Sequence, residues 1–165
     1  MERGGQEQLS FGMIFSIILI VVFVAFAVYA ITKFLSIGEI AQIAKFAEQM
    51  ESDIDKIWKG SQGSRTAEYF LPSKIEYVCF ADYNSNKKGA NQGFYDELNL
   101  VYSSGENLFF YPVGSSEGLT SKEVKHIDIE KITEKENPYC IKNTDGKIKI
   151  TLKKDFSEAL VTITR

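Results

Sequence analysis

Residues 11–31 form a run of twenty-one residues without a charged side chain, FGMIFSIILIVVFVAFAVYAI. A helix of that length rises about 30 Å, the thickness of a bilayer's hydrocarbon core. A cleaved secretory signal would have a shorter apolar core, although Ala25-Phe26-Ala27 fits a cleavage site. A buried core helix is the third alternative, but branched and aromatic side chains all around the helix suit lipid better. The run predicts a single transmembrane helix over residues 11–33, preceded by a tail or leader, residues 1–10.

After Lys33 the apolar residues become periodic, with spacings of three and four that indicate one stripe along a helix. The stripe consists of Ile40, Ile43, Ala47, Met50, Ile54 and Ile57. The opposite, polar face is expected to carry charged residues such as Lys45 and Asp53. Residues 34–60 are therefore predicted to continue the first helix, to about Lys59, as an amphipathic segment. Its stripe would pack on this chain's own C-terminal domain or, alternatively, in a coiled coil between chains.

The remaining residues, 61–165, read as a β-rich domain. Alternating or β-branched and aromatic segments predict strands. These are residues 74–83, 95–103, 108–113, 124–132, 139–141, 147–153 and 160–165. Asn143-Thr144-Asp145-Gly146 predicts a hairpin turn between two of them. The expected fold class is α+β, with a long N-terminal helix, first transmembrane and then amphipathic, packed on an antiparallel β-sheet domain.

The chain has two cysteines, Cys79 and Cys140. Two cysteines in one extramembrane domain fit a disulfide, which persists in an oxidising compartment. This interpretation places the C-terminal domain outside the cell, whereas a free buried pair is the alternative. The bond would close a loop of about 60 residues and contribute roughly 4 kcal/mol in the chain-entropy model.

Motifs for chemistry are weak. His126 is the sole histidine and is predicted to be a solvated residue on a strand, and no nucleophile or phosphate-loop motif is present. Asp82, Asn84 and Asn86 have the spacing that begins a calcium loop, but its glycine and glutamate positions lack those residues, so a solvated loop is preferred. With 19 basic and 22 acidic residues and no basic cluster, a nucleic-acid partner is not expected. We expect no cofactor and no enzymatic activity.

A short polar tail, an apolar helix, its amphipathic continuation and a β-rich head together resemble type IV pilins and pilin-like proteins. The residues Arg3-Gly4-Gly5-Gln6 resemble the basic-Gly-Gln junction of archaeal members with class III signal peptides. The resemblance, specific over residues 3–35, implies cleavage after Gly5 by a prepilin-peptidase-type enzyme. It also implies assembly through the helix, although Ser10 occupies the position of the glutamate that such pilins use in docking.

These observations predict a membrane-anchored, pilin-like archaeal surface protein with a structural or adhesive role. One form of this role is that of a filament subunit. Its partners would be the lipid bilayer and other copies, with Gly12 and Ser16 as close-contact points between helices, because small residues four apart permit close approach. The alternative is a bitopic envelope or secretion-accessory protein with a β-rich binding domain that does not polymerise. An unrecognised enzyme is a third alternative.

Overall fold

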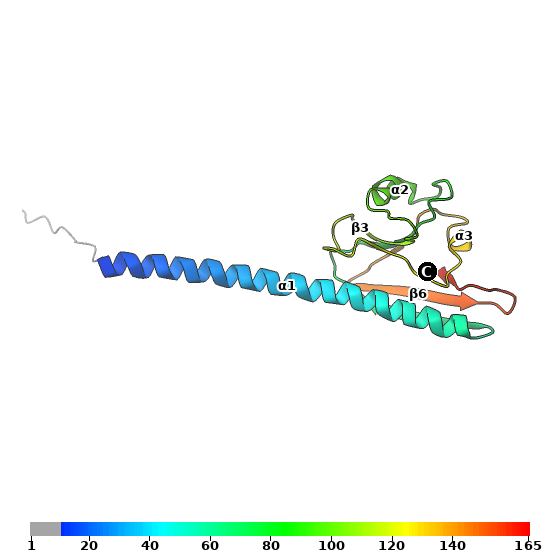
Figure 1. Ribbon diagram of the computed structural model, residues 1–165, viewed down its shortest axis with the longest axis horizontal. Helices are drawn as coiled ribbons and strands as arrows, with labels where there is room; N and C mark the ends of the chain where they lie inside the picture. The colour runs from blue at the N-terminus through cyan, green and yellow to red at the C-terminus, as the bar shows by residue number, and fades with distance from the viewer. Residues whose placement is uncertain (1–10) are drawn as a thin grey trace, which may run out of the picture. The chain divides into compact units, whose positions relative to one another are not determined.

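A computed structural model describes residues 11–165, so the predicted junction at Arg3, Gly4, Gly5 and Gln6 lies outside the described residues. The chain divides into two compact units, Met1–Ile37 (unit 1) and Gly38–Arg165 (unit 2). Helix α1, Phe11–Lys59, runs without interruption through the boundary (Figure 1). The predicted continuous helix and its end at Lys59 are therefore confirmed.

Unit 2 contains two antiparallel sheets. Sheet A has the order β1-β6-β7, and sheet B has the order β4-β3-β2-β5. The strands are β1 (Gly63–Phe70), β2 (Tyr77–Phe80), β3 (Leu108–Tyr111), β4 (Ser121–Lys122), β5 (Tyr139–Lys142), β6 (Lys147–Lys154) and β7 (Thr162–Thr164). Two short helices, α2 (Gln92–Asn99) and α3 (Ile129–Ile132), complete the unit.

The main core is formed by the C-terminal section of α1 together with both sheets. Phe46 of α1 joins them, because its ring makes edge contacts with Tyr69 of β1 and Phe110 of β3. Along β6, Ile148 and Ile150 are fully buried, and lysines alternate with them on the solvent side, as their period of two predicts. The α+β class, with a long helix packed on antiparallel sheets, is confirmed.

A second, smaller core lies on the other face of sheet B. Phe109 belongs to this core and Phe110 to the main core, since successive residues of a strand point to opposite faces. Leu98 of α2 and the two cysteines share the smaller core with Phe109. Sheet B is therefore buried on both faces, which explains why its strands are rich in apolar residues.

The apolar stripe of α1 is confirmed over most of its length. Ile43, Ala47, Met50, Ile54 and Ile57 are buried. Ile40 is the exception, because it lies at the start of unit 2 and remains exposed. The assignment of Asp53 to the polar face was wrong, because its side chain is buried against β1.

Three segments of the β-rich part differ from prediction. Residues 63–70 form β1, for which the sequence predicted no strand. The predicted strand over residues 95–103 is wrong, because helix α2 covers residues 92–99. The predicted strand over residues 124–132 is also wrong, since it ends in α3, whose first turn is capped by the side chain of Asp128 accepting a hydrogen bond from the Lys131 N–H.

The turn at Asn143-Thr144-Asp145-Gly146 forms, but it does not make a hairpin within one sheet. Asp145 and Gly146 both have positive φ, and Thr144 and Lys147 exchange backbone hydrogen bonds across the turn. However, β5 pairs with β2 in sheet B, whereas β6 pairs with β1 and β7 in sheet A. The turn therefore carries the chain from one sheet to the other.

Candidate functional site

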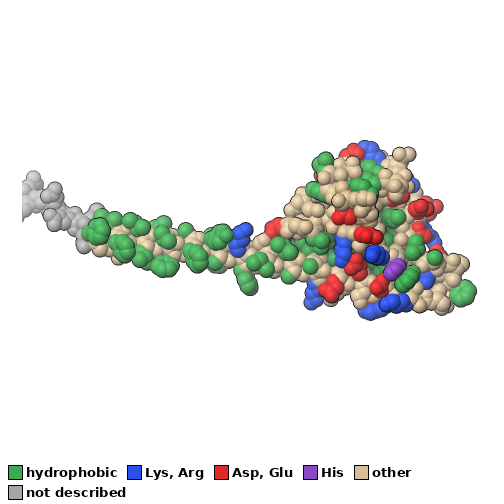
Figure 2. Space-filling view, viewed as in Figure 1, with side chains coloured by type: hydrophobic (Ala, Val, Ile, Leu, Met, Phe, Trp, Pro, Cys, Tyr) green, Lys and Arg blue, Asp and Glu red, His purple; other side chains and the backbone are tan. Residues whose placement is uncertain are grey.

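The apolar section of α1 is the largest candidate functional surface of unit 1. Within the described residues, α1 alone is long and apolar enough to cross a membrane, and no residue of its most apolar stretch is buried. Hydrophobic side chains cover the visible surface of this section (Figure 2). Exposed apolar surface of this extent in a soluble protein would be costly, whereas lipid would cover it at no such cost.

The hydroxyl groups of this section are hydrogen-bonded to the helix itself. The Ser16 hydroxyl donates to the carbonyl oxygen of Gly12 at 2.8 Å, and the Thr32 hydroxyl donates to that of Tyr29 at 2.9 Å. Such bonds remove the cost of placing a hydroxyl in hydrocarbon. Gly12 and Ser16 thus lie one turn apart and remain available as the predicted close-contact points.

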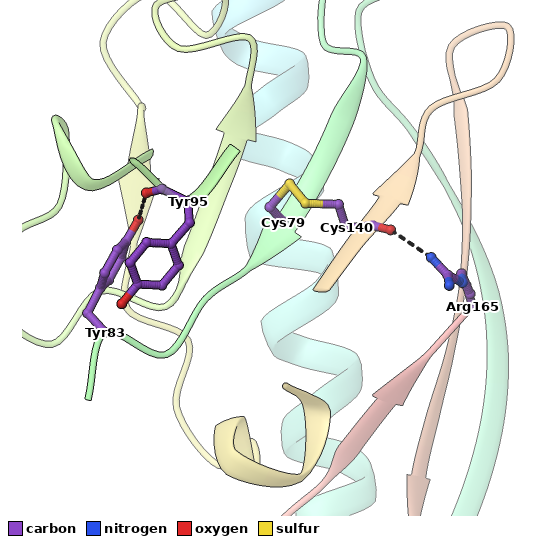
Figure 3. The surroundings of a disulfide bond; sticks show 5 residues. All are labelled: Cys79, Tyr83, Tyr95, Cys140 and Arg165. Atoms are coloured by element: carbon purple, nitrogen blue, oxygen red, sulfur yellow. Dashed lines mark hydrogen bonds between the residues drawn. A yellow bond between two sulfur atoms is a disulfide. The ribbon is translucent and has the colours of Figure 1, made fainter. Parts of the chain in front are cut away.

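Cys79 and Cys140 are bonded to each other, which is the pairing that the sequence predicted. They lie opposite each other on β2 and β5, with 4.0 Å between their Cα atoms (Figure 3). Both are buried in the smaller core. The Arg165 guanidinium donates a hydrogen bond to the Cys140 carbonyl oxygen at 3.2 Å, so the outer side of β5 is covered at this point.

The predicted loop at Asp82, Asn84 and Asn86 is built around a buried carboxylate. Asp82 accepts hydrogen bonds from the backbone N–H of Asn84 and the hydroxyl of Ser85, at 2.9 and 2.6 Å, so both of its oxygens are occupied by the loop. Its backbone is held by the buried side chain of Asn137. Residues 11–165 contain no group of three or more His, Cys, Asp and Glu side chains arranged for a metal ion. Asp82 therefore shapes the loop rather than facing solvent.

His126 is not on a strand, so its predicted place was wrong. It has a φ of +65° and stacks on Trp58, with ring centroids 3.6 Å apart. Its Nδ1 lies 2.9 Å from a carboxylate oxygen of Asp55. Both contacts tie the segment before α3 to the C-terminal end of α1, which gives His126 a structural role.

A polar cluster around Asp53 was missed by the sequence interpretation. The carboxylate accepts hydrogen bonds from Arg65 and Tyr69 of β1, at 2.9 and 3.1 Å, and from Lys56 at 3.1 Å. Burial, followed by the negative charge of Asp53, raises the pKa of Tyr69. The sequence signal that could have indicated the burial of Asp53 was its position, directly before Ile54 and at the border of the apolar stripe.

A groove runs between α1 and β1 in unit 2, and the Asp53 cluster forms its floor. It comprises two hollows of about 730 and 410 Å³. Polar residues of α1, including Lys45, Gln49 and Ser52, line one side. Consecutive residues of β1, from Arg65 to Phe70, line the other.

The groove, the disulfide and the apolar segment are the features of the described residues that bear on function. Comparison with known proteins found no matching family model, curated protein or solved structure. A function therefore has to be inferred from the anchor-like segment, the oxidised cysteines and the surfaces of unit 2.

Proposed function

We propose that this chain is a membrane-anchored, pilin-like surface protein of an archaeon with a structural or adhesive role. The observation that carries the proposal is the difference in exposure between the two sections of α1. Its section in unit 1 exposes apolar side chains, and its section from Ile43 onward buries its apolar stripe in the core of unit 2. One helix thus supplies both a membrane anchor and the central support of a β-rich head, which is the layout of pilin-like proteins.

The second part of the proposal is processing at the N-terminus. Cleavage after Gly5 by a prepilin-peptidase-type enzyme would leave Gln6 as the first residue and keep the apolar segment in the mature protein. Mass spectrometry of the protein isolated from its native membrane tests this directly. A chain that begins at Gln6 supports pilin-type processing, whereas an intact Met1 or a start near Ile31 contradicts it.

The proposed orientation places unit 2 outside the cell, because the buried Cys79–Cys140 disulfide requires an oxidising compartment to form. Intact cells treated with a protease that cannot cross the membrane provide the test. Digestion of unit 2 in intact cells, detected with an antibody against unit 2, supports the orientation. Protection in intact cells combined with digestion after lysis contradicts it, and a cytoplasmic protein digested under both conditions serves as the leakage control.

A second candidate, a bitopic protein that does not polymerise, is favoured by one residue. If the mature chain begins at Gln6, Ser10 occupies the position at which the resembling pilins carry a docking glutamate. Shearing of intact cells separates the two functions. A polymer that contains this chain in the sheared fraction supports a filament subunit, whereas retention of the whole chain in the membrane supports the non-polymerising anchor.

A further inference from the structure

The outer edge of sheet A is an unpaired strand. Strand β1 is the terminal strand of that sheet and pairs over eight residues with β6 alone. The Leu71 N–H donates to the Gly146 carbonyl oxygen at 2.9 Å, which sets the alternation of hydrogen bonds along the pair. By that alternation, the N–H and C=O groups of Ser64, Thr66, Glu68 and Phe70 point away from β6. Within residues 11–165 these groups have no hydrogen-bond partner.

This edge lacks three features that commonly protect a terminal strand, and its two charged residues, Arg65 and Glu68, are already paired with Asp53 and Lys147 of the same chain. Strand β1 contains neither proline nor lysine, and its pairing with β6 is regular from Gly63 to Phe70, without a bulge. The groove between α1 and β1 leaves open space directly beside it. An extended chain could therefore lie beside β1 and form the missing hydrogen bonds.

We propose that the occupant of this edge is β1 of a second copy of this chain, paired antiparallel about a two-fold axis at Ala67. In this register Arg65 faces Tyr69 of the second copy, and Thr66 faces its Glu68. No like charges face each other, whereas a register centred on Glu68 would place two carboxylates together. Ala67 faces itself at a non-hydrogen-bonded position, where Cα atoms are about 4.5 Å apart and a small side chain fits.

The pairing has a directional consequence within unit 2. Trp58 lies beside the start of β1, because its carbonyl oxygen accepts a hydrogen bond from Lys154, the partner of Gly63. Phe46 contacts Tyr69 near the other end, so α1 runs opposite to β1. Two copies joined antiparallel thus have their Gly38 ends at opposite ends of the joined sheet. If each copy is anchored in a membrane as proposed above, this arrangement suits two copies that lie on facing membranes. The proposed adhesive role would then be self-recognition, the binding of one copy to another.

Cysteine cross-linking of the full-length protein in detergent micelles tests the pairing without depending on the anchor or its processing. Under mild oxidation, Ala67→Cys should give several-fold more covalent dimer than Lys149→Cys, which is an exposed residue of the same sheet away from the edge. In the Ala67→Cys background, Thr66→Pro removes the outward N–H together with the hydroxyl that is hydrogen-bonded to Thr151, and it should abolish the dimer. Thr66→Val, which loses the same hydroxyl but retains the N–H, should preserve it.

An equal dimer yield from the Ala67→Cys and Lys149→Cys proteins, or an unchanged yield with Thr66→Pro, would overturn the proposal. A second pair guards against misfolding of the proline variant. In the proposed register, Ser64 faces Phe70 of the other copy. Mixed Ser64→Cys and Phe70→Cys chains should therefore cross-link to each other more than either cross-links to itself, and the opposite preference contradicts the register.

Facing membranes are tested with two vesicle populations that carry Ala67→Cys chains of different mass. Covalent dimers of mixed mass, formed without vesicle fusion, support pairing between membranes. Dimers of a single mass only would show that copies in one membrane pair and would overturn the self-recognition role. Protein that remains in the vesicles after alkaline washing verifies the anchor separately.

Discussion

The buried carboxylate of Asp53 makes Tyr69 the most informative single side chain of unit 2. Replacing Tyr69 with Phe removes a hydrogen bond to a charged partner, while Arg65 and Lys56 still neutralise that partner. We expect Tyr69→Phe to lower the free energy of unfolding by about 1.5 kcal/mol. Urea unfolding followed by the fluorescence of Trp58 measures it. Tyr139→Phe, whose hydroxyl is bonded at the surface to the Arg165 N–H, should cost about 0.5 kcal/mol or less.

The same tyrosine makes stability depend on alkaline pH. Because burial and the charge of Asp53 raise the pKa of Tyr69 above the ordinary value of 10.0, the unfolded chain loses this proton at a lower pH than the folded chain. The contribution is complete below pH 10 and declines as the pH rises beyond it. Wild-type stability should therefore fall as the pH rises above 10, as measured by circular dichroism. Tyr69→Phe should fall less steeply, and an identical slope would contradict the shift.

Residue-scale prediction from sequence succeeded where burial follows periodicity alone. Ile43, Met50 and Ile54 are buried because they repeat at helical spacing and face one partner. Asp53 was misplaced because its burial depends on Arg65, which lies in a strand that the sequence did not reveal. A charged side chain enters a core when a distant segment neutralises it, and one segment's periodicity does not contain that information.

At the scale of elements, the turn that carries the chain between the two sheets depends on Gly146. Its φ is +76°, and an added Cβ would lie 3.2 Å from the carbonyl oxygen of Leu71. Gly146→Ala should therefore cost about 1 to 2 kcal/mol. Gly93→Ala is the matched control, because the new Cβ meets no atom within 4 Å in α2 and should stabilise by about 0.5 kcal/mol. Equal effects of the two substitutions in chemical unfolding would contradict this assignment.

The disulfide joins two strands that are also hydrogen-bonded neighbours, so its contribution comes mainly from the unfolded chain. The cysteines are 61 residues apart, and a loop of that length corresponds to about 4 kcal/mol in the chain-entropy model. Replacing Cys79 and Cys140 together with Ala should lower the free energy of unfolding by about that amount. Alkylation of the native, unreduced protein should modify no thiol, whereas two modified thiols would contradict the bond.

Elements whose apolar residues follow one clear spacing were predicted correctly. Elements whose apolar residues fit both helical and strand spacing were not. Leu98 and Leu100 alternate as in a strand, but Phe94 and Leu98 are also four apart. Helix α2 buries Leu98 and partly buries Phe94, whereas Leu100, just after the helix, is exposed. Strand β1 was missed because only Ala67 and Tyr69 face the core as apolar residues, with Arg65 completing that row. In both cases the tertiary partner decides between local alternatives.

At the scale of the whole molecule, apolar residues follow two distinct patterns along one chain. Within residues 11–165 the buried hydrophobic residues all lie from Ile43 onward, whereas the large apolar residues of unit 1 are exposed. The buried residues stabilise unit 2 through packing, whereas the exposed apolar residues of unit 1 require an apolar environment outside the chain, such as lipid. Folding of the head and anchoring should therefore be separable properties, although a single helix serves both.

This separation leads to a truncation test. A chain that begins at residue 38 keeps the whole buried core and should remain soluble without detergent, retain the Cys79–Cys140 bond and unfold in one cooperative transition. A chain that begins at residue 53 loses Ile43, Phe46 and Met50 from that core and should fail to fold, since each such loss costs about 2 to 5 kcal/mol. Gel filtration and the fluorescence of Trp58 distinguish the two. Aggregation of the longer fragment would mean that unit 1 contributes to folding of the head.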